Sequence, residues 1–268
     1  MITADYHVHT SFSSDSKEPM ESMIQKAIDS GFTRICITDH MDFDYPAQYN
    51  LPFVFDPAEY ANKITELRKR YQDQINLLMG IECGIKPDLH ERYHELLSQY
   101  EFDFVIASSH LVDNMDVYYP EYWKGISEEE GYKKYFESIL KNINHFDNFD
   151  VYGHLDYVVR YGPSKGKDFK VELYRELFEE ILKKIISMGK GIEVNTAGYK
   201  YGLCRPHPTP EILKLYKELG GNILTIGSDA HKTEHLAYDF EKARLLLLNL
   251  GFTRYTVFEN RKPIFLDL

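Results

Sequence analysis

"FDFVIASS", residues 102–109, decides the fold class of this 268-residue chain. Its middle, Phe104 to Ala107, is a continuous apolar run and not an alternation of apolar and polar residues. A strand with one face in water alternates, so a continuous run indicates burial on both faces, which is typical of parallel sheets covered by helices. The runs "RICIT" (34–38) and "ILTI" (223–226) have the same character. The sequence therefore favours an α/β protein with a parallel sheet.

Seven short apolar runs alternate with amphipathic segments along the whole chain. Helix-start signals precede several of these segments: Asp56 stands before Pro57, and Ser127 with Glu130 forms a capping box. No low-complexity linker or charge block divides the chain, so a single domain, 1–268, is predicted. Seven βα units imply a barrel or a doubly wound sheet. Strands are predicted at 2–8, 34–38, 75–82, 102–109, 149–153, 191–195 and 223–228, helices at 19–31, 56–71, from 87 onward, 127–143, 171–187, 210–219 and 235–251, and one more short strand within 253–268.

Each predicted strand ends in a residue that can bind a metal ion or form a hydrogen bond. Six of the eleven histidines lie at these positions, although helices fill most of the chain. In a parallel barrel the carboxyl ends of the strands meet on one face, where the active sites of this architecture lie. His7 and His9 point the same way from an extended strand, so both can bind one ion. The residues in question are His7, His9, Asp39, His40, Glu82, His110, His154, Asn195, Asp229 and His231.

The number of ligands predicts two or three divalent metal ions. Six imidazoles with Asp15, Glu82 and Asp229 make nine ligands, whereas one catalytic ion takes three or four from the protein. Imidazoles and carboxylates without thiolate suit zinc, manganese or iron. Two ions roughly 3.5–4 Å apart can hold a bridging hydroxide for in-line attack at phosphorus. Glu82, alone at its strand end, is predicted to bridge ions, and Asp39 is predicted to orient His40 or to cap a turn.

Seven motifs, in order, resemble the polymerase and histidinol phosphatase (PHP) family: "HVHTSFSSDS" (7–16), "ITDH" (37–40), "GIECG" (80–84), "ASSH" (107–110), "GHLDYVVRYG" (153–162), "EVNTAG" (193–198) and "GSDAH" (227–231). The resemblance covers the chain from residue 5 to about residue 231. It implies a distorted (β/α)7 barrel, similar to a TIM barrel, with three metal ions at the C-terminal ends of its strands. Glu82 and Asp229 are also predicted to be catalytic residues. The implied ligand sets are His7, His9, Glu82 and Asp229 for one ion, Glu82, His110 and His154 for a second, and Asp15, His40 and His231 for a third.

Within this family the chain resembles the stand-alone histidinol-phosphate phosphatases, through "GHLDYVVRYG" and "EVNTAGYKYGLCRPHPTPEIL" (193–213). That resemblance implies hydrolysis of L-histidinol phosphate to L-histidinol and phosphate, a step of histidine biosynthesis, by a metal-bridging hydroxide. Arginine can bind phosphate oxygens with two parallel hydrogen bonds, so Arg160 and Arg205 are predicted phosphate contacts. His207 is predicted to donate a proton or to contact the substrate. Asn195 and Asp42 complete the predicted substrate contacts, and the carboxylates considered for the substrate ammonium are Asp42, Asp44 and Asp156.

Three other functions compete with this prediction. A nucleotide or oligonucleotide phosphoesterase would use the same metal site, and a degenerate PHP module would act as a binding domain, although none of the nine ligands is missing here. "HERYH" (90–94) matches the H-E-x-x-H signature of zinc peptidases. We expect it on the exposed face of a helix that begins at Pro87, away from the strand ends. A metallopeptidase is therefore the remote alternative.

Composition predicts partners and location. The net charge of −11, from 31 basic and 42 acidic residues, argues against nucleic-acid binding, so a small phosphate monoester is the expected partner. The chain has no long apolar run, so no membrane span is predicted. Its first residues have no basic start followed by an apolar segment, so no secretory signal is predicted. Three scattered cysteines indicate reduced thiols and a cytoplasmic protein. The sequence carries no signal for the oligomeric state.

Overall fold

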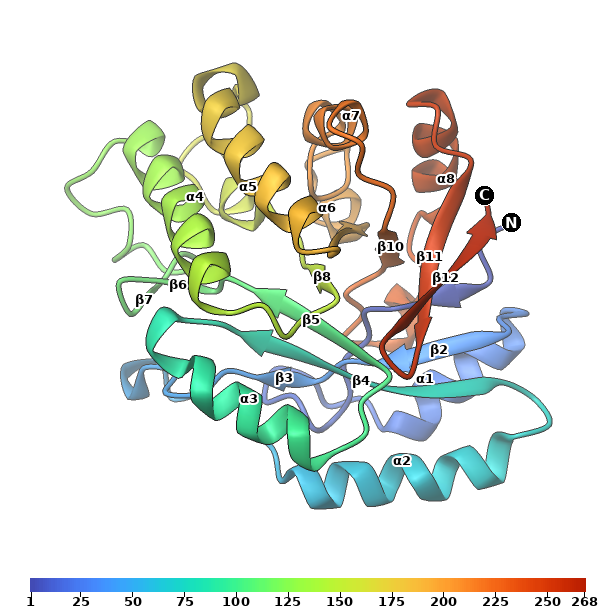
Figure 1. The fold of residues 1–268 in the computed structure, drawn as a ribbon. Coiled ribbons are helices and arrows are strands. Elements are labelled where there is room, and N and C mark those ends of the chain that lie inside the picture. The colour runs from blue at the N-terminus through green and yellow to red at the C-terminus, as the bar shows by residue number, and fades with distance from the viewer.

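The computed structural model describes residues 1–268, and its centre is a barrel of parallel strands with helices on the outside (Figure 1). The first and last strands of the sheet meet, because Tyr6 N–H donates to the carbonyl of Ile226 at 3.1 Å and Val8 forms a parallel bridge with Ala230. This nearly closed ring confirms the predicted (β/α)7 barrel. Its strands follow the order β1 (Ala4–Asp5), β2 (Arg34–Ile37), β4 (Asn76–Gly84), β5 (Phe104–Ser108), β8 (Val151–Tyr152), β9 (Gly191–Asn195) and β10 (Leu224–Gly227), with β3 (His40–Met41) beside β4.

The helices begin where their capping residues predict. The Asp56 carboxylate accepts a hydrogen bond from Ala58 N–H at 2.8 Å, and the Ser127 hydroxyl accepts one from Glu130 N–H at 3.2 Å. Three predicted helices begin later than predicted: residues 87–89 and 171–174 form separate 3-10 turns before α3 and α5, and the last helix begins only at Phe240. No helix combines the length and the apolar character needed to cross a membrane. The helices are α1 (Met20–Asp29), α2 (Pro57–Tyr71), α3 (His90–Gln99), α4 (Glu128–His145), α5 (Arg175–Ser187), α6 (Ala197–Lys200), α7 (Pro210–Glu218) and α8 (Phe240–Asn249).

The strands are buried on both faces, as their continuous apolar runs predict. Every residue of β5, β9 and β10 is buried. The helices cover them with apolar stripes at helical spacing, such as Phe178, Ile181 and Ile185 on α5. Burial of each such side chain contributes about 1.5–3 kcal/mol to folding. This packing fixes the strands and therefore the positions of the side chains at their C-terminal ends.

The C-terminal segment corrects the prediction of one short strand. It forms two antiparallel strands, β11 (Arg254–Glu259) and β12 (Lys262–Asp267), which Figure 1 draws in red. Leu224 N–H donates to the Thr256 hydroxyl at 3.1 Å, and the Tyr6 hydroxyl donates to the Phe258 carbonyl at 2.8 Å. Because Leu224 begins β10, this hairpin covers the N-terminal end of the barrel. A second unpredicted hairpin, β6 (Leu111–Val112) with β7 (Met115–Asp116), follows His110 at the opposite end.

Candidate metal centre and active site

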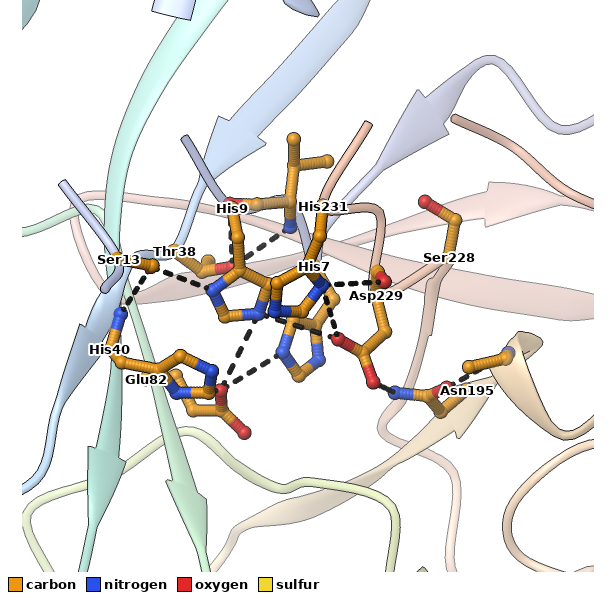
Figure 2. Close-up of polar contacts among 12 residues, drawn as sticks. His7, His9, Ser13, Thr38, His40, Glu82, Asn195, Ser228, Asp229 and His231 are labelled. Atoms are coloured by element: carbon orange, nitrogen blue, oxygen red, sulfur yellow. Dashed lines mark hydrogen bonds and ion pairs between the residues drawn. The ribbon is translucent and has the colours of Figure 1, made fainter. Parts of the chain in front are cut away.

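Glu82 lies at the centre of a histidine cluster at the C-terminal ends of the strands (Figure 2). Its Oε2 atom lies 2.8 Å from Nδ1 of His40 and 3.2 Å from Nε2 of His7. Its Oε1 atom lies 2.9 Å from Nε2 of His154 and 3.3 Å from Nε2 of His110. One carboxylate therefore contacts imidazoles that come from four separate segments of the chain.

Two more acids extend the cluster. Nε2 of His9 lies 3.5 Å from Oδ1 of Asp229. Oδ2 of Asp15 lies 3.0 Å from Nε2 of His231 and 3.7 Å from Nε2 of His40. The barrel thus brings all nine predicted metal ligands into one continuous group.

Carboxylates behind the cluster orient two of the imidazoles. Nδ1 of His7 lies 2.6 Å from Oε1 of Glu193, and Nδ1 of His110 lies 2.6 Å from Oδ2 of Asp42. An imidazole that donates its Nδ1–H to a carboxylate keeps the lone pair on Nε2 for a metal ion. In both cases Nε2 is the atom that faces Glu82.

The electrostatics of the cluster keep Glu82 and Asp229 anionic and His9 neutral. Burial acts to raise the pKa of Glu82, but the charge on His7 and its neighbouring imidazoles outweighs burial and holds that pKa well below its usual range. The Asp229 carboxyl is affected in the same way, and its pKa is also held well below the ordinary value. Burial, together with two adjacent imidazoles, lowers the pKa of His9 well below its ordinary value. The acids are therefore anionic and His9 is neutral, as metal coordination requires.

Unsatisfied ligand atoms provide a direct test of whether the cluster fits metal ions. Buried polar atoms are nearly always hydrogen-bonded, yet Nε2 of His7, Nε2 of His9, Nε2 of His231 and Oε2 of Glu82 have no hydrogen-bond partner. Several sets of three potential ligands lie with their ligand atoms within 4.8 Å of one another. The cluster therefore fits several metal ions. The sets are His7, His9 and Glu82; Glu82, His110 and His154; His9, His40 and His231; and His40, Asp42 and His110.

Comparison with known proteins agrees with this arrangement. Residues 5–197 match the family model of the PHP domain. The chain belongs to the PHP domain family. This confirms the resemblance that the motifs carry.

Two relatives of this PHP domain match it over nearly their full length. A histidinol-phosphatase of Lactococcus lactis subsp. lactis is 33% identical over 263 residues, which are 98% of this chain and 96% of the relative. A probable histidinol-phosphatase of Clostridium acetobutylicum is 31% identical over 266 residues, with 98% and 96% covered. A crystal structure of the histidinol phosphate phosphatase from Lactococcus lactis, complexed with zinc, L-histidinol and phosphate, has a TM-score of 0.89, 32% identity, and coverage of 98% of both chains.

A cavity of about 580 Å³ gives access to the histidine cluster of the PHP domain. Six of the nine predicted ligands line it: Asp15, His40, His110, His154, Asp229 and His231. Most of the remaining wall of the cavity is aromatic and was not predicted from the sequence. The loops that carry these rings have no periodic pattern from which to read where a side chain points. The aromatic residues are Tyr45, Phe53, Tyr118, Tyr119, Tyr157, Tyr161 and Tyr201.

Two of the predicted substrate contacts line this cavity. Arg160 does so without forming an ion pair with any carboxylate, and its Nε atom has no hydrogen-bond partner. Asp42 also lines the cavity, although its Oδ2 atom is already bound to His110 and only Oδ1 lacks a partner. Arg160 is thus placed to meet an anion, whereas Asp42 has a first task in orienting a histidine.

Three other predicted substrate contacts lie outside the lining of the cavity. Arg205 donates from Nη1 to Oδ2 of Asp156 at 2.9 Å, and His207 is hydrogen-bonded through Nδ1 to the other oxygen of the same carboxylate. Asn195 donates from Nδ2 to Oδ2 of Asp229 at 3.4 Å. Each side chain therefore binds an acid of the protein in this structure. Their contact with substrate stays a prediction, as does proton donation by His207.

The peptidase signature does not form a metal site. On α3, Nδ1 of His90 faces the Pro87 carbonyl at 3.0 Å. His94 is 46% exposed, with Asp147 as its nearest acid at 3.7 Å. Neither histidine belongs to any set of three potential ligands. The exposed-helix interpretation of "HERYH" agrees with this geometry.

Glu193 is an acid that supports a ligand and was not predicted from the sequence. Glu193 is buried within β9 and contacts His7, although a lone acid in the apolar run "GIEVN" was an available signal. Asp39 accepts a hydrogen bond from the Ser13 hydroxyl at 2.6 Å, and that hydroxyl lies 3.1 Å from Nδ1 of His9. Asp39 therefore holds the turn after β1, which was one of its two predicted roles.

Proposed function

We propose that this PHP domain is a metal-dependent phosphomonoesterase that hydrolyses L-histidinol phosphate to L-histidinol and phosphate. The observation that carries the proposal is Glu82, which lies within 3.3 Å of four imidazoles beside a cavity that also holds the unpaired cation Arg160. The relative from Lactococcus lactis, whose crystal structure holds zinc, L-histidinol and phosphate, supports the choice of substrate.

The nine ligands are proposed to hold three divalent ions, with zinc favoured by the metal in that relative. Such ions supply Lewis acidity toward phosphate oxygens and a nucleophilic water at neutral pH. Glu82 contributes to two sets because its two oxygens face different histidines. The proposed sets are His7, His9, Glu82 and Asp229; Glu82, His110 and His154; and Asp15, His40 and His231.

The other residues of the site bind and orient. Arg160 is proposed to bind the phosphate, since its guanidinium lines the cavity and has no counter-ion in the protein. Glu193 and Asp42 hold His7 and His110 in the tautomer that leaves Nε2 free. The aromatic wall is proposed to exclude water around the reacting phosphate, which strengthens every electrostatic contact there. A cytoplasmic location is part of the proposal, supported by three cysteines that are all free thiols.

Turnover of three substrates tests the proposal. The zinc-loaded protein is assayed for phosphate release from L-histidinol phosphate, a mononucleotide and a dinucleotide. We expect kcat/KM for L-histidinol phosphate to exceed that for either nucleotide by roughly 100-fold, because the cavity must match the leaving group. Faster hydrolysis of a nucleotide would replace this function with a nucleotide phosphoesterase. Activity that survives complete removal of metal would contradict the metal-dependent mechanism itself.

A further inference from the structure

Arg160 is held in an unusual way for a cation that is partly buried. It lies at the end of the 3-10 turn Tyr157–Arg160 that follows β8. No carboxylate forms an ion pair with it, whereas Arg205, in the loop between α6 and α7, is paired with Asp156 at 2.9 Å. A buried charge is ordinarily paired, so something else must stabilise this guanidinium.

Three tyrosine rings surround the guanidinium. The Arg160 Cζ atom lies 4.2 Å from the ring centroid of Tyr201, 4.7 Å from that of Tyr161 and 4.8 Å from that of Tyr157. All three distances are within the range of about 6 Å for an attractive cation–π contact. The Tyr161 hydroxyl also accepts a hydrogen bond from Nη2 of Arg160. We call these three rings the tyrosine cage.

The cage stabilises the cation without neutralising it. A tyrosine phenol has an ordinary pKa of about 10 and is neutral near pH 7, and partial burial raises the pKa of Tyr201 to about 12. Burial also raises the pKa of Tyr161, although the charge on Arg160 opposes it. A carboxylate in the same place would compete with a phosphate for the guanidinium, and a neutral ring does not.

We propose that Tyr157, Tyr161 and Tyr201 are positioning residues that hold Arg160 in place of a carboxylate, so that its full charge is available to the phosphate group of the substrate. This inference rests on the proposed function, because it assigns a phosphate to the cavity. It deepens that function by explaining how one arginine stays in place and yet remains free to bind an anion.

Tyr201 offers the cleanest test. Tyr201 is 55% exposed, so its replacement is expected to leave the fold intact, whereas Tyr157 also packs against the ring of His154 at 4.8 Å. We expect Tyr201→Leu to raise the Kd of inorganic phosphate roughly 3- to 10-fold, as loss of one cation–π contact predicts. Isothermal titration of phosphate into the zinc-loaded protein measures this value. KM for L-histidinol phosphate should rise by a similar factor with kcat changed less than twofold.

Matched variants separate the cage from a general effect. Tyr201→Phe keeps the ring and should bind phosphate within twofold of the parent protein. Tyr238→Leu, at a tyrosine that is 36% exposed and has no contact with Arg160, should also have no effect. In an Arg160→Met background, Tyr201→Leu should change the phosphate Kd less than twofold, because the cation that the ring holds is gone.

Three outcomes would overturn the proposal. The first is an unchanged phosphate Kd in Tyr201→Leu. The second is an equal loss in the Arg160→Met background, which would mean that the ring touches the ligand itself. The third is loss of zinc from Tyr201→Leu, which would assign the ring to the metal cluster. The proposed function fails separately, if the parent protein does not hydrolyse L-histidinol phosphate, and the phosphate titration tests the cage even then.

Discussion

Replacing Glu193 by glutamine is expected to weaken metal binding, although Glu193 is not itself one of the nine ligands. Its carboxylate is buried and uses both oxygens. Oε1 lies 2.6 Å from Nδ1 of His7. Oε2 accepts hydrogen bonds from the backbone N–H of His154 at 2.9 Å and from Nδ2 of Asn195 at 3.2 Å. One side chain therefore fixes a ligand that follows β1 and the backbone of a ligand that follows β8.

Glutamine has the same shape but only one accepting oxygen. Whichever way its amide turns, either Nδ1–H of His7 or the N–H of His154 faces an NH2 group instead of an acceptor. Loss of the carboxylate that orients a metal-binding histidine costs roughly 10- to 100-fold in metal affinity. This factor corresponds to about 1.4–2.7 kcal/mol.

The assay is a competition for zinc. Parent protein and Glu193→Gln are loaded with zinc and dialysed against graded chelator, and the zinc retained is measured by atomic emission. We expect the variant to lose its zinc at a free-chelator strength 10- to 100-fold lower. The control is Glu241→Gln on α8, where the side chain is 62% exposed and pairs only with Arg244. If Glu193→Gln retained zinc as tightly as the parent, contact with Glu82 alone would suffice to orient His7, and the reasoning would be wrong.

Four further predictions concern the same centre. His110→Ala should remove phosphatase activity and bound metal, whereas His94→Ala, at an exposed position on α3, should leave both unchanged in phosphate-release and metal assays. Arg205→Met should lower Tm by roughly 3–10 °C, because a charge-assisted hydrogen bond to buried Asp156 is lost. KM for L-histidinol phosphate should stay within twofold of the parent protein. A raised KM at unchanged Tm would instead favour the phosphate contact predicted from the sequence. Chelation should lower Tm by roughly 8–16 °C if zinc is present at 1,000 times its Kd, and calorimetry that shows equal Tm values would contradict the metal cluster. Burial acts to lower the pKa of His40, but the charges on Glu82 and Asp15 raise that pKa to about 9 in the metal-free protein. Zinc must therefore displace a proton from His40, and the affinity for zinc should rise as pH approaches 9. Titration calorimetry that shows no dependence of zinc affinity on pH would refute this.

The order of strands and helices can be predicted because its signals are local. Continuous apolar runs mark the barrel strands, and Asp56 and Ser127 mark helix starts that the structure bears out. The C-terminal hairpin is harder to predict, because its turn lies at Asn260 and Arg261, which take left-handed φ values of 49° and 63°. Tight hairpin turns usually contain glycine, which marks them in a sequence, and this turn contains none. A turn held by long-range contacts leaves little trace in the sequence.

Side-chain partners explain which site predictions have structural support. Strand ends converge in any parallel barrel, so membership of the metal cluster depends on position alone. Arg160 and Arg205 were predicted to bind phosphate from their residue type alone. Residue type does not tell whether a carboxylate of the protein already binds the guanidinium. Asp156 is buried and binds both Arg205 and His207, so each of these two predicted substrate contacts already has a carboxylate partner in the protein. Arg160 remains free because its neighbours are aromatic rings, and only the folded chain reveals that environment.

Glu193 shows that an acid within an otherwise apolar barrel strand can predict a residue that orients metal ligands. The run "GIEVN" is buried throughout, and a carboxylate in such a strand costs several kcal/mol unless polar groups satisfy it. Side chains two residues apart point to the same side of a strand, so Glu193 and Asn195 share a face. Asn195 ends its strand at the metal cluster, and that face must therefore be polar. The acid then belongs inside the barrel among the histidines, where Nδ1 of His7 lies 2.6 Å from its Oε1 atom. A buried acid two residues before a strand-end polar residue is thus itself a sign of the shell that orients metal ligands, and Glu193→Gln tests that inference directly.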